Sequence, residues 1–281
     1  MDLIRLPAFP SVPTTGPASL VTSVLRGYSL HGLMFQRGGG AFTAAMISGI
    51  RIRQGGKDVV NALPGTELAE MNAYDGVTDN ANFNTLFFGD PTARTIRGQH
   101  FGDLDLDVYR EELEIEVSIA GATTPTLDVL AIVGPPKLAM GVGFDALSAA
   151  TFRSLVRTVI QPAAAVTRQN YGIAAGSRAG ALLRRAWFFH ANLTSVEFTK
   201  NSIRKWDDIS ATRNNAYQAL FARTPQAGLY VLDRVADGNL GEAEPTVDAN
   251  GNPWNFQFNL TTSGADTITA FSDILTDRAK L

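Results

Sequence analysis

Residues Glu112–Gly134 read ELEIEVSIAGATTPTLDVLAIVG, and this stretch decides the fold class. In its first part Leu113, Ile115, Val117 and Ile119 alternate with polar residues. A period of two is typical of a strand that has one buried face and one face toward solvent. The turn-forming segment GATTP then separates this strand from a second apolar run, TLDVLAIV, so the stretch predicts a β-hairpin.

The pattern of this hairpin recurs at the end of the chain. Residues Pro253–Leu275 read PWNFQFNLTTSGADTITAFSDIL, and an offset of 141 residues aligns strand, polar turn and second strand without a gap. An earlier pair agrees, because GIRIRQGGKDVVN and SVEFTKNSIRKWDDI each read as strand and turn, and a short helix ending in Asn-Ala-Tyr follows each at Tyr74 and Tyr217. Two matches in the same order at nearly the same offset predict two homologous β domains.

The predicted fold class is mainly β, with two tandem eight-stranded jelly-roll barrels and a few short helices. Domain size and the number of short strands favour the jelly roll, although the strand order does not follow from the residues alone. Helical periodicity is confined to Glu67–Tyr74 and Asp207–Leu220, and Phe144–Ile160 is ambiguous. The predicted domains are an extended N-terminal arm at 1–19, a first barrel at 20–134, a linker at 135–150 and a second barrel at 151–281.

The predicted arm is defined by its prolines. Pro7, Pro10, Pro13 and Pro17 follow one another at intervals of three or four residues, a density that excludes helix and central strand. Apolar residues between them indicate that the arm packs against its own barrel or a neighbouring subunit.

Composition narrows the functional classes. The 281 residues include no cysteine, which excludes disulfides, thiolate metal sites and cysteine nucleophiles. The net charge is −3, so the chain lacks the basic excess typical of proteins that grip nucleic acid, and no sequence-specific nucleic-acid binding is expected. The start MDLIRLPAFPSVP does not resemble a signal peptide, and the most apolar window, Leu127–Phe144, is too interrupted to span a bilayer.

The sequence contains no complete catalytic motif, so the protein is expected not to be an enzyme and to have no catalytic or cofactor-binding residues. His31, His100 and His190 lie at least 69 residues apart, which favours ordinary surface or interface histidines over a metal site. The Gly38–Gly40 stretch lacks the residues that complete a phosphate loop and is interpreted as a flexible loop. Gly141–Ala146 spells a loose dinucleotide motif but follows prolines rather than a buried strand.

Two acidic segments could bind a structural metal ion. Asp103, Asp105 and Asp107 alternate with apolar residues, which favours the solvent face of a strand, and structural calcium is the alternative. Asp248 opens the segment DANGNP, which is interpreted as a hairpin turn centred on Asn250 and the glycine that follows it.

Basic and aromatic residues cluster in the second half. Arg178, Arg184 and Arg185 form the densest basic group, which is expected to be a solvated face. Trp187 and Trp206 are expected in the core of the second barrel or at its junction with the first. A nucleic-acid stacking platform is the weaker alternative, because it needs basic neighbours along one groove.

These features together resemble a known family, the double jelly-roll major capsid proteins of tailless icosahedral bacteriophages, and among them the corticovirus-type coat protein. The resemblance rests on the proline-containing N-terminal segment, on the twice-used strand–turn–helix unit and on a chain that ends soon after its last hairpin. The resemblance covers nearly the whole chain, and it depends on the order of strands, turns and helices rather than on invariant sequence motifs.

The resemblance implies a major capsid protein that trimerises into pseudo-hexagonal capsomers tiling an icosahedral shell. Its implied partners are further copies of itself, other virion proteins such as a penton, and an internal membrane under the shell. Its implied location is the virion, assembled in the host bacterial cytoplasm. Two alternatives stay open: a phage spike or other sugar- or receptor-binding β protein, and a two-barrel metalloenzyme.

Overall fold

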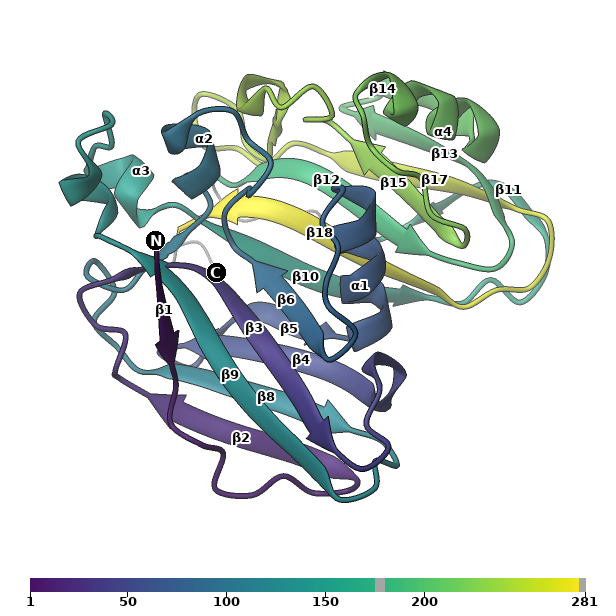
Figure 1. The fold of residues 1–281 in the computed structure, drawn as a ribbon. Coiled ribbons are helices and arrows are strands. Elements are labelled where there is room, and N and C mark those ends of the chain that lie inside the picture. The colour runs from purple at the N-terminus through teal and green to yellow at the C-terminus, as the bar shows by residue number, and fades with distance from the viewer. Residues whose placement is uncertain (175–179, 278–281) are drawn as a thin grey trace. The chain divides into compact units, whose positions relative to one another are not determined.

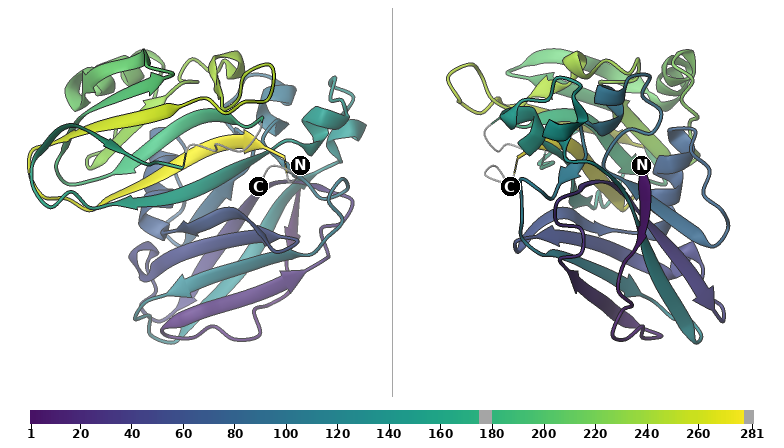
Figure 2. Two further views of the ribbon diagram at one scale, coloured as in Figure 1. Left: turned by 180° about the vertical axis from the view of Figure 1, so that it is seen from behind. Right: turned by 60° about the vertical axis from the view of Figure 1, so that its left-hand side comes forward.

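The chain forms two compact units, Met1–Ser154 and Leu155–Leu275, in a computed structural model that describes residues 1–174 and 180–277. The strands of each unit form two sheet layers, coloured purple to teal in the N-terminal unit and teal to yellow in the C-terminal one (Figure 1). Two further views show the same strands from behind and from the side (Figure 2).

The N-terminal unit has strand orders β1-β9-β3-β6 and β5-β4-β8-β2 in its two sheets, and the short strand β7 pairs with β3. Along the chain, the strands enter the two sheets in turn, except for the β4–β5 hairpin, which stays in one sheet. This is the order of an eight-stranded jelly roll, which confirms the predicted fold. The bounds are β1 Asp2–Arg5, β2 Gly16–Thr22, β3 Ser29–Gly39, β4 Ile47–Gln54, β5 Lys57–Leu63, β6 Phe83–Phe87, β7 Leu104–Asp105, β8 Leu113–Ile119 and β9 Pro125–Gly134.

The C-terminal unit repeats that order strand for strand. Its sheets have the orders β10-β18-β12-β15 and β14-β13-β17-β11, and the short strand β16 pairs with β12 as β7 pairs with β3. The duplication predicted from sequence is therefore present in the topology of both units. The bounds are β10 Phe152–Ile160, β11 Val166–Tyr171, β12 Leu182–Phe189, β13 Leu193–Lys200, β14 Ile203–Ser210, β15 Leu229–Asp233, β16 Glu244–Pro245, β17 Phe256–Thr262 and β18 Ile268–Thr276.

The hairpin that decided the fold class is β8 and β9. In β8 the residues Leu113, Ile115, Val117 and Ile119 are buried, and the polar residues between them are half-buried, as the alternation predicts. At ~25 cal/mol per Å² of apolar surface, each such side chain contributes roughly 1.5–3 kcal/mol of hydrophobic free energy, which fixes the register of the strand.

The helices predicted at 67–74 and 207–220 are present, although residues 207–210 belong to strand β14, and the helix at 96–100 was not predicted. The helices are α1 Gly65–Tyr74, α2 Ile96–His100, α3 Ala146–Ala150 and α4 Ala211–Leu220, and three 3-10 turns are η1 Ala44–Met46, η2 Lys137–Met140 and η3 Leu240–Glu242. The ambiguous stretch 144–160 divides into α3 and strand β10. The expected linker 135–150 holds η2 and α3, and Asp145 caps α3 by accepting a hydrogen bond from the Ser148 N–H at 2.8 Å.

Hydrogen bonds and helix positions shift the alignment of the two repeats by three residues at this helix. The Asn72 side chain donates to the Thr85 carbonyl at 2.8 Å, and the Asn214 side chain donates to the Val231 carbonyl at 2.9 Å. These carbonyls occupy matching positions of β6 and β15. Gln218 donates to the same Val231 carbonyl at 2.7 Å and is the eighth residue of α4, as Asn72 is of α1. The structural counterpart of Asn72 is therefore Gln218, whereas the sequence motif had aligned it with Asn215.

The segment expected to be an extended arm contributes two strands to the first barrel. Asp2–Arg5 pairs with β9 as strand β1, and β2 begins at Gly16 and pairs with β8. Both are edge strands in the strand orders given above, and Pro17 lies in β2, where its missing N–H is tolerated.

The core of the second barrel is rich in aromatic residues. Trp206 belongs to it, and its Nε1 donates a hydrogen bond to the Tyr230 hydroxyl at 2.8 Å. Trp187 is also fully buried, but it follows Arg185 along β12, and its ring lies 5.4 Å from that guanidinium. Because side chains alternate along a strand, Trp187 lies on the face of β12 opposite to the core residue Phe188.

Candidate functional site

Two of the three histidines converge on one buried carboxylate of the N-terminal unit. His31 Nδ1 lies 2.8 Å from Asp103 Oδ1, and His100 Nδ1 lies 2.6 Å from Asp103 Oδ2. The two imidazole rings are 5.1 Å apart, and all three side chains are buried. The expectation that these histidines lie at the surface or at an interface was wrong, because each has a buried carboxylate as its partner.

Local structure brings the three residues together across 72 positions of sequence. His31 is the extra residue of a β-bulge, where the pairing of β3 with β9 shifts between Leu30 and Gly32. His100 ends α2, whose first turn is capped by the Thr95 hydroxyl. Asp103 immediately precedes β7, which pairs with the start of β3. The cluster therefore depends on the bulge and on the short helix at once.

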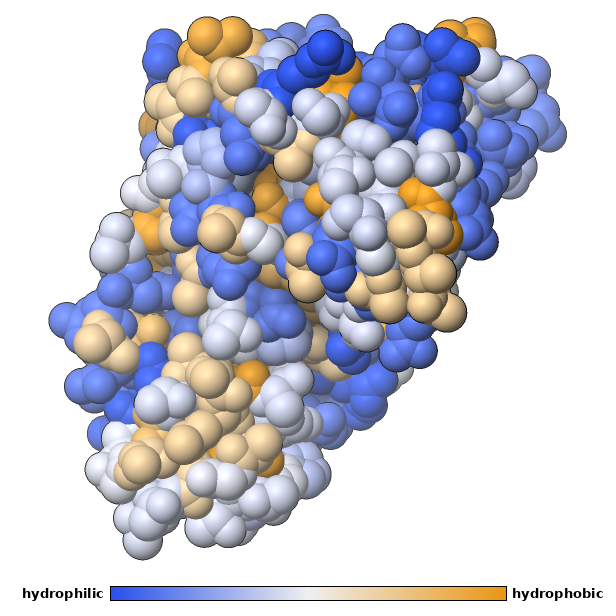
Figure 3. Space-filling view, turned by 90° about the vertical axis from the view of Figure 1, so that its right-hand side faces the viewer, coloured by the Kyte–Doolittle hydropathy of each residue, from blue (hydrophilic) through white to orange (hydrophobic). Residues whose placement is uncertain are grey.

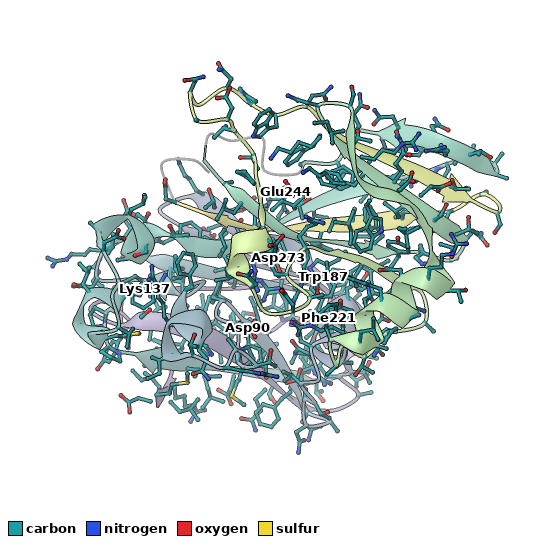
Figure 4. All side chains as sticks on the ribbon, turned by 90° about the horizontal axis from the view of Figure 1, so that it is seen from above. Asp90, Lys137, Trp187, Phe221, Glu244 and Asp273 are labelled. Carbon is teal, nitrogen blue, oxygen red and sulfur yellow. The ribbon has the colours of Figure 1, made fainter. Side chains whose placement is uncertain are left out.

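A buried lysine and a second carboxylate extend this cluster. Lys137 Nζ donates to the carbonyls of Phe101 and Thr151, and the Lys137 backbone N–H donates to Asp105 Oδ2 at 2.8 Å. Burial lowers the pKa of the Lys137 ammonium to about 8, although the negative charges of Asp103 and Asp105 oppose the shift. Figure 4 shows Lys137 among the side chains of its unit.

The acidic run is thus not the solvent face of a strand. Asp103 and Asp105 are fully buried, and β7 is only two residues long. Asp105 Oδ1 accepts the backbone N–H groups of Asp107 and Val108, at 3.0 and 3.4 Å. Charged residues are rarely buried unless they are paired, and these aspartates are paired on several sides.

The three side chains could hold a metal ion by residue type, since their ligand atoms lie within 4.8 Å of one another. The distances from Asp103 to both Nδ1 atoms are those of hydrogen bonds. Gly89 packs tightly against the pair, because a Cβ placed on it would come within 2.4 Å of both His31 and Asp103. The geometry therefore fits a closed hydrogen-bonded network that connects β3, α2 and β7.

The second barrel carries different chemistry at the matching bulge. The pairing of β12 with β18 shifts between Leu183 and Arg185, which makes Arg184 the counterpart of His31. Arg184 lies 3.8 Å from Asp273, and Arg185 lies 2.9 Å from Asp233. Both arginines are buried, so the expected solvated basic face was wrong for them, and Arg178 lies outside the described residues.

The remaining candidate residues have structural explanations. Gly38 and Gly39 end β3 rather than forming a loop, and Gly39 has φ +87 with the Thr124 carbonyl directly against it, so a side chain is excluded. His190 is half-buried, its Nδ1 accepts the Leu193 N–H at 3.1 Å, and burial lowers the pKa of its ring. Gly141, at the start of the loose dinucleotide motif, is the left-handed residue that ends η2.

DANGNP forms the turn expected of it. Asp248 Oδ1 accepts the N–H groups of Asn250 and Asn252, each at 2.8 Å, and Gly251 has φ +83. These hydrogen bonds, of which those from Asn252 are the strongest influence, lower the pKa of the Asp248 carboxyl.

Two features could not be recognised in the sequence: the buried cluster of His31, His100 and Asp103, and an exposed apolar surface on helix α4. The histidine signal was missed because the residues are distant in sequence and only the bulge and α2 bring them together. The surface is the outward face of α4, and the absence of charged residues between 214 and 222 could have pointed to it.

Two barrels of identical strand order, each closed around its own core, define the double jelly-roll class of protein. Solved structures of this class resemble the chain over nearly its full length. The major capsid protein P2 of bacteriophage PM2 superposes with a TM-score of 0.82 at 13% identity, covering 100% of this chain and 99% of that one. A chain in the atomic structure of Sulfolobus turreted icosahedral virus gives a TM-score of 0.66 at 10% identity, covering 99% of this chain and 91% of that one.

Family models identify the chain more closely than the fold does. The N-terminal domain of viral coat protein P2 matches residues 3–134, and its C-terminal domain matches residues 153–277. The chain therefore belongs to the viral coat protein P2 family and is a viral coat protein. Comparison with curated protein sequences gives no match.

Proposed function

We propose that three copies of this coat protein associate into a capsomer of pseudo-hexagonal outline, and that such capsomers tile an icosahedral shell. The observation that carries the proposal is the identical strand order of the two units. Three chains of two similar barrels present six similar barrels around one axis, and closed cyclic symmetry is the usual form of soluble assemblies. The role is structural, and we assign it no catalytic step.

The main partners of the chain would be further copies of itself. A penton protein would occupy the vertices of the shell, and an internal membrane would lie beneath it. Assembly would take place in the host cytoplasm. Among the described residues, none of the helices is long and apolar enough to cross a membrane.

Light scattering after gel filtration tests the trimer. We expect a species of about three times 30.1 kDa, stable on dilution, and regular sheets or shells by electron microscopy at high concentration. A monomer at all concentrations would contradict the proposal. A monomer that also bound one class of glycan on an array would instead support a spike or receptor-binding protein.

A further inference from the structure

The outward face of α4 is apolar. It consists of exposed residues that lie between Asn215 and Arg223, and we name it the α4 face: Ala216, Tyr217, Ala219, Leu220, Phe221 and Ala222. Leu220 is 80% exposed, Tyr217 39% and Phe221 36%. Tyr217 and Phe221 form an edge-to-face pair with their rings 5.1 Å apart, so the face is preorganised, and Figure 4 shows Phe221 just beyond the end of α4.

The inward face of the same helix is polar. Asn214 and Gln218 are its buried residues, and both side chains donate to the Val231 carbonyl, at 2.9 and 2.7 Å. An ordinary surface helix turns its apolar residues inward and its polar residues toward solvent, so α4 has the opposite polarity. Tyr217 packs edge-to-face on Trp206 of its own barrel, with the ring centroids 5.6 Å apart, but packing on that barrel does not explain the exposed Leu220 and Phe221.

The matching helix of the first barrel has the ordinary polarity. In α1 the residues Leu68, Met71 and Tyr74 are buried, and Glu67 and Glu70 lie on the half-buried side. Because the two helices occupy the same topological position, the exposed apolar face is a property of the second barrel alone. On the molecular surface, hydrophobic side chains gather in separate patches divided by hydrophilic ones (Figure 3).

The chemistry of the α4 face limits its partner. No charged residue occurs between Arg213 and Arg223, which disfavours nucleic acid and acidic peptides. Helices that lie on lipid surfaces carry many Lys and Arg residues on the opposite face, and the opposite face of α4 holds Asn214 and Gln218 instead. An uncharged face with exposed aromatic residues is typical of the central part of a protein–protein interface.

We infer that the α4 face is a contact surface for a second copy of this chain within the trimer. The inference rests on the proposed function, because a trimer of identical chains is held by head-to-tail contacts, each of which joins two different surfaces. Such a contact requires an apolar face on only one of the two barrels. The difference between α1 and α4 meets that requirement.

Replacing Leu220 with arginine tests this surface. The side chain is 80% exposed, so the substitution leaves the barrel intact, but it places a charge in the middle of the face. We expect Leu220→Arg to shift the native mass from about three times 30.1 kDa to 30.1 kDa at micromolar concentration, with unchanged circular dichroism. Ala216→Glu, on the same face, is expected to act in the same direction.

Ile203→Arg is the matched control, because Ile203 is a 64% exposed apolar residue of the same barrel at the start of β14, outside the α4 face. It should leave the trimer intact. A wild-type trimer that persists in both Leu220→Arg and Ala216→Glu would overturn this inference and leave the proposed function standing. A wild-type monomer would instead overturn the proposed trimer itself, and the two failures are therefore distinguishable.

Discussion

The two barrels interrupt the same strand pair at the same place and fill the interruption with different side chains. The bulge residue is His31 in the first barrel and Arg184 in the second. In the first barrel two imidazoles share the carboxylate of Asp103, whereas in the second two consecutive arginines face the carboxylates of Asp273 and Asp233.

This difference shows that the buried polar groups at the bulge do not determine the strand order, because the two barrels share the strand order and differ in these groups. Apolar alternation and turn positions recur in both halves and set the strand order. The buried polar groups do not recur, and in each set the buried charged residues lie close to partners of opposite charge or to hydrogen-bond partners. A jelly roll therefore tolerates several chemistries at this bulge, provided that every buried charge has a partner.

The largest effect is expected from removing the shared carboxylate. Asp103→Ala deprives two buried imidazoles of their partner, and such losses cost roughly 3–5 kcal/mol of unfolding free energy. Chemical denaturation of the purified protein measures the change. Asp107→Ala is the control, because the Asp107 side chain is 44% exposed, and a change of less than about 0.5 kcal/mol is expected. Equal losses in the two variants would show that the cluster does not stabilise the barrel.

The next effect concerns pH and Lys137. Its pKa falls from 10.5 in the unfolded chain to about 8 in the folded barrel. Between these values the unfolded chain binds more protons, so the contribution of Lys137 to stability rises with pH across the window from about 8 to 10.5. At 1.36 kcal/mol per pH unit, the full rise is about 3 kcal/mol.

Lys137→Met isolates this contribution. The unfolding free energy of the wild type minus that of the variant should increase between pH 8 and pH 10.5, measured by denaturant titration at each pH. A difference that stays constant or decreases with pH would show that the Lys137 ammonium keeps its ordinary pKa inside the barrel.

The smallest effect compares the two helix asparagines that each donate to a carbonyl of a neighbouring strand, Asn72 in α1 and Asn214 in α4. Asn72 donates to the Thr85 carbonyl and to Asp79, at 2.8 and 2.9 Å, so Asn72→Ala should cost about 1–3 kcal/mol. The Val231 carbonyl keeps Gln218 as a donor after Asn214→Ala, which should cost about 1 kcal/mol or less. Thermal unfolding of the two variants measures the difference, and a larger loss for Asn214→Ala would reverse the expected order.

The sequence predicted the repeated part of the fold well. The β8–β9 hairpin, its counterpart β17–β18 and the helices α1 and α4 all follow from local alternation and turn residues, which act over a few positions. The predicted arm was less accurate, because Asp2–Arg5 has no alternating signal and becomes a strand only by pairing with β9. The order of strands within each sheet also needed pairings between distant residues.

The candidate site was largely beyond prediction from sequence. The alternation of Asp103 and Asp105 with leucines suggested a long strand with a wet face, but the strand is two residues long, and the aspartates and the leucines are buried alike. The aspartates are paired with His31 and Lys137, which lie more than 30 positions away. Arg184 and Arg185 were misjudged for the same reason. Charged residues are assigned to the surface by default, and only the folded chain reveals their buried partners.

The edge strand β2 has a consequence for how copies of this chain meet. Pro17 lies in β2, so the strand offers one backbone donor fewer to any strand that approaches it. Uncontrolled edge-to-edge addition of strands would join subunits in arbitrary registers and trap them as aggregates. A protein that must meet many copies of itself gains from an edge that resists this addition, because association is then left to side-chain surfaces, which can require one orientation.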